Sequence, residues 1–385
     1  MFDKFHEECA AVGVINHSEA ATFCYLGLYS MQHPGQEGAG IVSTDSKEMY
    51  AYRDMGLVAD VFDPQTLAKL EGTAAIGHTR YATFGGKDWQ NLQPFVANFA
   101  HDSLALAHNG NLINATEVRG ELEESGAIFS STSDTEVILH LTARAKEDGI
   151  TKRLASALKQ VKGAYSLVVM TFDSLIGVRD PAGVRPLSLG KIGEGYIIAS
   201  ETCAFDLIGA QFIRDIEPGE ILEIRRDGTM SSNFDLREGP SAFWVFEYIY
   251  FARPDSNIAG RNVYLARKRL GAELAKEHPA QADFVIPVPD SGVPAALGYA
   301  HQSGIPMEFG LIRNPYVGRT FIEPAQSIRD FGVKVKLNPN DELIAGKRLV
   351  VVDDSIVRGT TCRKLVKMLR EAGAKEIHFR ISSPP

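Results

Sequence analysis

The sequence predicts a two-domain protein with α/β structure, from its length and from a buried strand, turn and helix near its C-terminal end. At 385 residues the chain is longer than one hydrophobic core usually serves. The apolar run from Arg348 to Asp354 indicates a buried parallel strand, and a helix is expected from about Cys362 to Ala372. A strand of small apolar residues is expected directly after Cys9. Eight mostly polar residues precede Cys9.

Composition excludes several classes of protein. Hydrophobic residues make up 44% of the chain and charged residues 23%, values typical of a soluble enzyme. A net charge of −8 argues against a nucleic-acid partner. No apolar run reaches membrane-spanning length and residues 1–8 do not resemble a secretory signal, so we expect a cytoplasmic protein without a membrane partner. The four cysteines are widely spaced, which disfavours a disulfide framework or a zinc ribbon.

The turn after the strand at 348–354 suits an anion. The hydroxyls of Ser355, Thr360 and Thr361 and the N–H groups of a helix N-terminus would donate hydrogen bonds to a phosphate. Asp353 and Asp354 lie at the carboxyl end of the strand and can accept hydrogen bonds from the vicinal hydroxyls of a sugar. The Gly-Lys-Ser/Thr ending of a Walker loop is absent. The alternative is an ordinary strand–turn–helix whose acidic pair caps the helix.

Two further segments of the second half suit a phosphorylated ligand. A strand over Asp283–Pro289 leads into Asp290 and Ser291. Between Leu311 and Lys336 five basic residues stand against two acidic ones, although the whole chain is acidic. This composition fits a lid that closes on a pyrophosphate and fits a solvated loop equally. An amphipathic helix is expected over residues 261–277.

Polar clusters in the first half indicate that Cys9 has a chemical role and is not simply a packing residue. A lone cysteine before an apolar strand is usually a buried small hydrophobe. Four clusters follow it, at Gln32–Ile41, Gly77–Thr83, Ala107–Leu112 and Thr132–Glu136. With Arg179–Leu187, Ala199–Asp206 and Pro218–Glu220, they resemble in order and spacing the N-terminal-nucleophile (Ntn) glutamine amidotransferases. That resemblance covers about residues 9–220 and implies an αββα sandwich.

The second half resembles a different family. The string Val350–Thr361 is similar to the phosphoribosyl pyrophosphate (PRPP) motif of type I phosphoribosyltransferases, which implies a parallel-sheet α/β domain. Joined to a glutaminase half, it resembles the glutamine phosphoribosylpyrophosphate amidotransferase (amidophosphoribosyltransferase) family, as do the strings Glu247–Ser256, Tyr316–Ile322 and Arg370–Ala374. This resemblance implies a leader over residues 1–8, a first domain with α+β structure over 9–240 and a second domain with α/β structure over 241–385. It also implies hydrolysis of glutamine through Cys9 and passage of ammonia to C1 of PRPP. The products would be 5-phosphoribosylamine, pyrophosphate and glutamate, in the first committed step of de novo purine (IMP) synthesis.

The resemblance also implies roles for residues of the first half. Amide hydrolysis needs a nucleophile, and removal of the leader would free the α-amino group of Cys9 to act as its base. The family places the oxyanion against the Asn109 side chain and the Gly110 N–H. Arg80 would bind the α-carboxylate of glutamine and Asp134 its α-ammonium group. Solvated loops would explain Arg80 or Asp134 alone.

For the second half, the resemblance implies a PRPP site and a magnesium ion. The expected PRPP-binding residues are Asp290, Ser291, Arg319, Asp353, Asp354, Ser355, Ile356, Val357, Arg358, Gly359, Thr360 and Thr361. Mg²⁺ would be held mainly by substrate oxygens, with Ser291, Asp353 and Asp354 as the protein ligands. We expect no iron–sulfur cluster, because Trp244 stands where one ligand of cluster-bearing relatives would fall.

Some features depart from the family pattern or leave alternatives open. Pro34 and Pro315 stand where the family normally has arginine, and the chain stops at Pro385 where relatives continue, which we take as C-terminal shortening. The alternatives are a different amidotransferase, a glutaminase fused to a salvage transferase, and a non-catalytic PRPP sensor. The resemblance implies a homo-oligomer, a dimer or tetramer, with AMP and GMP as regulatory ligands.

Overall fold

The chain forms two compact units. A computed structural model describes residues 9–81, 89–99, 102–315, 337–356 and 359–384. Unit 1 consists of Met1–Trp244 and Ser256–Gly260, and unit 2 consists of Val245–Asp255 and Arg261–Pro385. The chain therefore crosses between the units more than once near residues 244–261. No helix among the described residues is long and apolar enough to span a membrane.

Unit 1 is built on two antiparallel sheets. The first has seven strands in the order β11 (Gln211–Asp215), β9 (Ser188–Ile192), β10 (Gly195–Ala199), β1 (Ala10–Ile15), β4 (Ala74–Arg80), β2 (Gly38–Thr44) and β3 (Met49–Met55). The second has six strands in the order β13 (Met230–Asn233), β12 (Ile221–Arg225), β8 (Ser174–Arg179), β7 (Gly163–Met170), β6 (Asp102–Leu112) and β5 (Phe95–Phe99). A core cluster shared by both sheets shows that they pack face to face.

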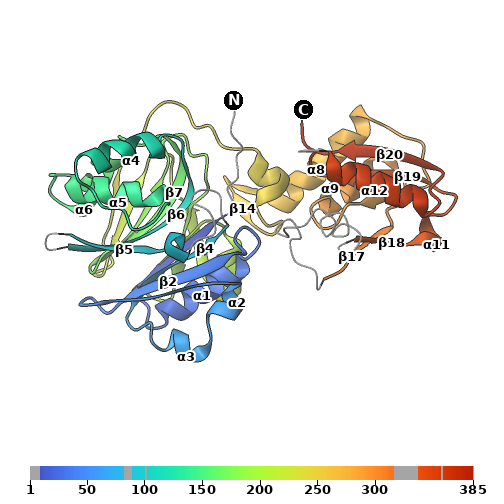
Figure 1. The fold of residues 1–385 in the computed structure, drawn as a ribbon. Coiled ribbons are helices and arrows are strands. Elements are labelled where there is room, and N and C mark those ends of the chain that lie inside the picture. Colours follow the sequence, from blue (N-terminus) through green and yellow to red (C-terminus); the bar gives the residue numbers. More distant parts are fainter. Residues whose placement is uncertain (1–8, 82–88, 100–101, 316–336, 357–358, 385) are drawn as a thin grey trace. The chain divides into compact units, whose positions relative to one another are not determined.

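Helices cover the outer face of each sheet (Figure 1). On the seven-stranded sheet lie α1 (Ala20–Ser30), α2 (Val58–Val61), α3 (Pro64–Leu67) and α7 (Cys203–Ile208). On the six-stranded sheet lie α4 (Ala115–Glu124), α5 (Thr135–Arg144) and α6 (Ile150–Leu158). A short 3₁₀ turn, η1, spans Trp89–Asn91. The layers are helix, sheet, sheet and helix, so the predicted αββα sandwich is confirmed.

The pattern of β1 follows from these layers. Its side chains alternate between two cores: Ala11 and Ile15 face the six-stranded sheet, whereas Val12 and Val14 face α1. Both faces are buried, which explains why the strand after Cys9 is continuously apolar instead of alternating with polar residues.

Unit 2 contains a parallel sheet in the order β16 (Phe284–Pro287), β19 (Arg348–Asp353) and β20 (Glu376–Ile381). The helices are α8 (Val263–Glu277), α9 (Val293–Ser303), α11 (Asp341–Ile344) and α12 (Thr360–Glu371), with a π-helical turn, η2, at Glu247–Phe251. Strands β17 (Leu311–Arg313) and β18 (Leu337–Pro339) pair antiparallel. Strand β15 (Arg261–Asn262) precedes α8, and β14 (Asn257–Ile258) belongs to unit 1.

The predicted elements of unit 2 are present, with small shifts at their ends. The strand expected over 348–354 is β19, which has Leu349 and Val351 in the core with α12 and Val350 and Val352 in the core with α8 and α9. The helix expected from about residue 362 is α12, which begins two residues earlier. The helix expected over 261–277 begins at residue 263, because the Asn262 side chain caps it by accepting a hydrogen bond from a backbone N–H.

Two glycines allow α8 and α9 to pack closely. A Cβ atom on Gly271 would overlap the carbonyl oxygen of Ala295, and one on Gly298 would overlap that of Lys268. The backbones therefore approach at two points where no side chain fits.

We predict that Gly271→Ala destabilises unit 2 by about 1–3 kcal/mol, because the added methyl group must push the two helices apart. Calorimetric unfolding of the full chain measures the change. The matched control is Gly120→Ala in α4, where a Cβ meets no atom within 4 Å. It should be neutral or stabilising by up to about 1 kcal/mol. Equal effects of the two substitutions would contradict the close approach.

Candidate functional site

Cys9 lies at the start of β1, beside the end of β4. The antiparallel register pairs Ala10 with Thr79, and Cys9 and Arg80 are the next residues on either side of this pair. The Cys9 Sγ donates a hydrogen bond to the Tyr81 carbonyl oxygen at 3.8 Å, and the side chain is half-buried. Strand alternation puts Cys9 on the same side as Ala11, which faces the second sheet. The thiol is therefore directed toward the space between the sheets.

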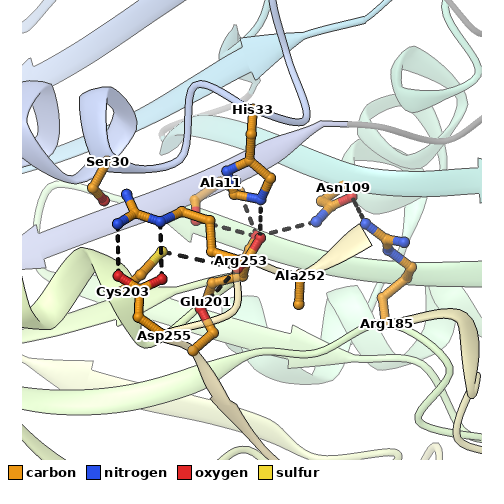
Figure 2. Close-up of polar contacts among 12 residues, drawn as sticks. Ala11, Ser30, His33, Asn109, Arg185, Glu201, Cys203, Ala252, Arg253 and Asp255 are labelled. Atoms are coloured by element: carbon orange, nitrogen blue, oxygen red, sulfur yellow. Dashed lines mark hydrogen bonds and ion pairs between the residues drawn. The ribbon is translucent and has the colours of Figure 1, made fainter. Parts of the chain in front are cut away.

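Asn109 approaches from the opposite sheet and is almost fully buried. Its Oδ1 accepts a hydrogen bond from Arg185 Nη2 at 2.9 Å (Figure 2). Its Nδ2 donates to Ser200 Oγ at 3.1 Å. The same Ser200 oxygen accepts the N–H of Ala11 at 3.0 Å. A short hydrogen-bonded path therefore connects Asn109 to the strand that begins after Cys9.

Gly110 is required by packing as well as by any chemistry. It has φ of +154°, and a Cβ there would overlap the Ala164 carbonyl oxygen and lie 2.8 Å from His108 Nε2. No other residue fits this position of β6 without displacing its neighbours. The glycine keeps the backbone beside Asn109 free of side-chain atoms.

Arg80 and Asp134 are connected through Asn91. Arg80 is buried, and its Nη1 donates to the Asn91 carbonyl oxygen at 2.9 Å. The Asn91 side chain exchanges hydrogen bonds with Thr132, from Nδ2 to Oγ1 at 2.9 Å and from the Thr132 N–H to Oδ1 at 3.0 Å. Thr132 is two residues before Asp134. The structure therefore links the two predicted glutamine-binding residues through a partner that the sequence did not single out.

Asp134 is buried at the start of α5. One carboxylate oxygen accepts the Leu112 N–H at 2.9 Å, and the other lies 3.9 Å from His108 Nδ1. His108 Nδ1 also lies 3.0 Å from the Thr135 hydroxyl. Burial lowers the pKa of His108, which favours the neutral form of this imidazole beside the Asp134 carboxyl group.

The string Arg179–Leu187 forms a loop that places Arg185 within hydrogen-bonding distance of Asn109. Arg179 donates to the carbonyl oxygens of Arg185, Gly183 and Ile216 at 2.8–2.9 Å. The Asp180 carboxylate accepts the backbone N–H of Arg185 at 3.1 Å. This string and Ala199–Asp206 match the family pattern in the sequence, but that match predicts no role for Arg185 or Ser200.

The Gln32–Ile41 and Ala199–Asp206 strings also meet. His33 Nε2 lies 2.7 Å from Glu201 Oε1 (Figure 2). Ser256 donates to the other Glu201 oxygen at 2.8 Å. Pro34, next to His33, is buried in the turn before β2. Pro315 is exposed, and the lid segment 316–336 lies outside the described residues.

In unit 2 the two predicted anion-binding turns meet at one edge of the parallel sheet. Strands β16 and β19 are paired, so their carboxyl ends lie together. The Ser291 hydroxyl donates to Asp354 Oδ1 at 3.1 Å. Asp290 instead pairs with Arg313 of β17. The structure therefore brings Ser291 to the acidic pair and turns Asp290 toward a cation.

Asp353 and Asp354 are both buried, at 8% and 5% exposure. The Asp354 N–H donates to Asp353 Oδ1 at 2.9 Å, and Ser355 donates to Asp354 Oδ2 at 3.0 Å. Burial, with the neighbouring carboxyl of Asp354, raises the pKa of Asp353. The site thus favours a ligand that supplies hydroxyl donors or a cation.

The turn after the acidic pair ends at a helix N-terminus. Gly359 has φ of +68° and precedes the first residue of α12, Thr360, which is exposed; Thr361 is half-buried. Ile356 is exposed at 52%. Three expected PRPP-binding residues lie outside the described residues: Arg319, Val357 and Arg358.

Oxygen donors at this edge suit Mg²⁺ with few protein ligands. Two carboxylates and one hydroxyl are hard ligands, and Mg²⁺ usually keeps waters and substrate oxygens in its shell. Among the described residues, no group of three or more His, Cys, Asp or Glu side chains is placed to hold a metal ion.

Comparison with known proteins agrees with both units. Residues 78–206 match the glutamine amidotransferase domain, and residues 259–382 match the phosphoribosyl transferase domain. Amidophosphoribosyltransferase of Rhizobium etli is 54% identical over 389 residues, covering 99% of this chain and 78% of the relative. The chain belongs to the amidophosphoribosyltransferase family. Membership confirms the predicted family and its two-domain fold.

Solved structures of the family agree closely with this chain. The allosteric regulatory enzyme of purine biosynthesis superposes with a TM-score of 0.93 at 51% identity, covering 98% of this chain and 81% of that one. Glutamine PRPP amidotransferase from B. subtilis, complexed with ADP and GMP, superposes with a TM-score of 0.92 at 50% identity, covering 98% and 82%. The predicted enzyme class, a glutamine-dependent transferase, is confirmed by this membership.

The geometry predicts which thiols of the native protein react. Cys9 and Cys362 are partly exposed, whereas Cys24 and Cys203 are buried. Burial also raises the pKa of Cys24. We predict that iodoacetamide labels Cys9 and Cys362 at neutral pH and labels Cys24 and Cys203 only after unfolding. Peptide mass spectrometry measures the labelling, and native modification of Cys24 would contradict the packing of α1.

Proposed function

We propose that residues 9–240 hydrolyse glutamine and residues 241–385 use the released ammonia to convert PRPP to 5-phosphoribosylamine. Glutamate and pyrophosphate are the other products. One observation carries the proposal: Asn109 of one sheet is joined through Ser200 to Ala11 of the other sheet, two residues after Cys9 and on the strand that pairs with the strand of Arg80. The chain is an amidophosphoribosyltransferase by family, so this reaction is the first committed step of purine synthesis.

The glutaminase half-reaction uses the residues around Cys9. Removal of residues 1–8, which lie outside the described residues, would give Cys9 a free α-amino group. That group accepts the thiol proton, and sulfur attacks the amide carbon of glutamine. The oxyanion would bind the Asn109 Nδ2 and the Gly110 N–H, while Arg80 and Asp134 hold the α-carboxylate and α-ammonium groups. The protonated α-amino group then gives its proton to the amide nitrogen, ammonia leaves, and water hydrolyses the thioester to release glutamate and free Cys9.

The transferase half-reaction uses the carboxyl edge of the parallel sheet. The α12 N-terminus with Thr360 and Thr361 would hold the 5-phosphate, and Asp353 and Asp354 would accept hydrogen bonds from the ribose hydroxyls. The turn at Asp290 and Ser291 would face the pyrophosphate, with Arg319 from the proposed lid; Ser355–Gly359 completes the turn. Ammonia forms the new bond to C1 as the bond from C1 to pyrophosphate breaks.

We assign Mg²⁺ to the same edge, with Ser291, Asp353 and Asp354 as its protein ligands. The ion would neutralise the charge of the departing pyrophosphate. A cation beside the two carboxyl groups would favour the ionised form of Asp353, whose pKa is raised by burial. We propose that no iron–sulfur cluster is present, since Trp244 occupies the place of one ligand.

Purine nucleotides are the proposed regulatory ligands, because a relative at 50% identity has been solved with ADP and GMP bound. We propose AMP and GMP as inhibitors, a cytoplasmic location, and a homo-oligomer, dimer or tetramer. Nucleic acids and membranes are not proposed partners, given the net charge of −8 and the absence of a spanning helix among the described residues.

The two half-reactions should separate on mutation. We predict that Cys9→Ala abolishes glutamine-dependent synthesis but keeps synthesis from ammonium salts, because the second site receives the same nucleophile either way. Mass-spectrometric detection of phosphoribosylamine, trapped as its glycinamide product, measures both activities. Cys362→Ala is the thiol control and should retain glutamine hydrolysis. Equal loss of both activities in Cys9→Ala would refute the separation.

The reciprocal change concerns the acidic pair. We predict that Asp353→Asn combined with Asp354→Asn lowers PRPP turnover with ammonia by at least about tenfold, since two charge-assisted contacts to ribose are lost. Cys9 in that variant should still react with a glutamine-analogue alkylator. Asp341→Asn, an exposed carboxylate of α11, is the control for charge. Normal PRPP turnover in the double variant would rule out the ribose contacts.

A further inference from the structure

The side-chain amide of Asn109 forms hydrogen bonds through both its oxygen and its nitrogen. Arg185 is 3% exposed and donates from Nη2 to Asn109 Oδ1 at 2.9 Å (Figure 2). Asn109 Nδ2 donates to Ser200 Oγ at 3.1 Å. A guanidinium has only donors, so the amide oxygen must face Arg185 and the amide nitrogen must face away. The partners of Asn109 therefore set which atom is available to a bound substrate.

Ser200 connects this amide to the strand of the nucleophile. Its hydroxyl accepts the Ala11 N–H at 3.0 Å and the Asn109 N–H, and donates to the Ala11 carbonyl oxygen at 3.3 Å. The Ser200 backbone N–H donates to the same carbonyl oxygen at 3.0 Å. All three hydrogen-bonding positions of the hydroxyl are used. Because Ala11 is two residues from Cys9, these bonds limit the separation of the thiol and the amide.

Arg185 also acts through its charge. A cation bonded to an amide oxygen draws electron density from the group and makes its N–H a stronger donor. In a buried site, where screening is weak, the same charge favours an anion that forms nearby. The bonds of Arg179 and Asp180 to the loop hold Arg185 in place before a substrate arrives.

We infer that Arg185 and Ser200 are positioning residues for glutamine hydrolysis: they orient the Asn109 amide toward the oxyanion, and Arg185 strengthens its donor. The inference rests on the proposed oxyanion role of Asn109. An interaction that matters only when the oxyanion forms lowers kcat and leaves KM unchanged. Synthesis from ammonium salts does not use this amide and is unaffected.

The test compares Arg185→Met, Arg185→Lys and Ser200→Ala in the full chain. We expect glutaminase kcat to fall roughly 10- to 100-fold in Arg185→Met and less in the other two, with KM for glutamine within about twofold. Alkylation of Cys9 by iodoacetamide, which forms no oxyanion, should keep its rate. If Arg185→Met does not fold, the other two variants carry the same test. Parental kcat in all folded variants, or equal loss of kcat and alkylation rate, would overturn the inference.

Two further variants separate the possible failures. Arg226→Met removes a half-buried arginine that donates to Phe172, Thr73 and Thr44 and lies outside the proposed site; it should alter stability without altering kcat. Asn109→Ala should lower kcat roughly 10²- to 10³-fold. A parental kcat in Asn109→Ala would refute the proposed oxyanion role itself. A loss in Asn109→Ala without a loss at Arg185 and Ser200 would refute only the positioning role.

Discussion

The site of unit 1 depends on the register of β1. This strand lies between β4 and β10 and is buried on both faces, so its pairing fixes the direction of every side chain. A slip of one residue would turn Cys9 from the space between the sheets to the face covered by α1. The apolar residues on each face prevent that slip, because the cores accept different side chains. The same packing that stabilises the sandwich therefore determines the direction of the Cys9 side chain.

Polar groups buried at the end of this strand are arranged by their need for partners. An unpaired polar group in a protein interior costs about 1–3 kcal/mol, so buried amides and guanidinium groups settle where hydrogen bonds are available. Asn109, Arg185 and Ser200 satisfy one another, and Arg80 and Asp134 are joined through Asn91. These bonds order the site before any substrate is present, which is the condition for electrostatic catalysis.

Unit 2 also brings its candidate ligand-binding residues together, but at the edge of a parallel sheet. Parallel strands end at a common edge, so Ser291 after β16 and Asp354 after β19 meet although they are far apart in the sequence. The helix that follows each strand begins at the same edge and directs its N–H groups there. Phosphate, sugar and metal ligands are thereby gathered without a dedicated metal cage.

The sequence alone determined the two-domain fold, the strand and helix around Asp353 and Asp354, and the family, because these depend on local pattern and contiguous motifs. It also singled out Cys9, Arg80, Asn109 and Asp134, whose roles stay proposals. Only the tertiary structure revealed Arg185, Ser200 and Asn91 as their partners, since hydrogen bonds between residues such as Asn109 and Ser200 depend on how two sheets stack. Strand periodicity specifies which face a residue occupies, but not which residue of another sheet lies opposite. For that reason the candidate site residues could be identified from the sequence, whereas the residues that hydrogen-bond to them could be identified only from the tertiary structure.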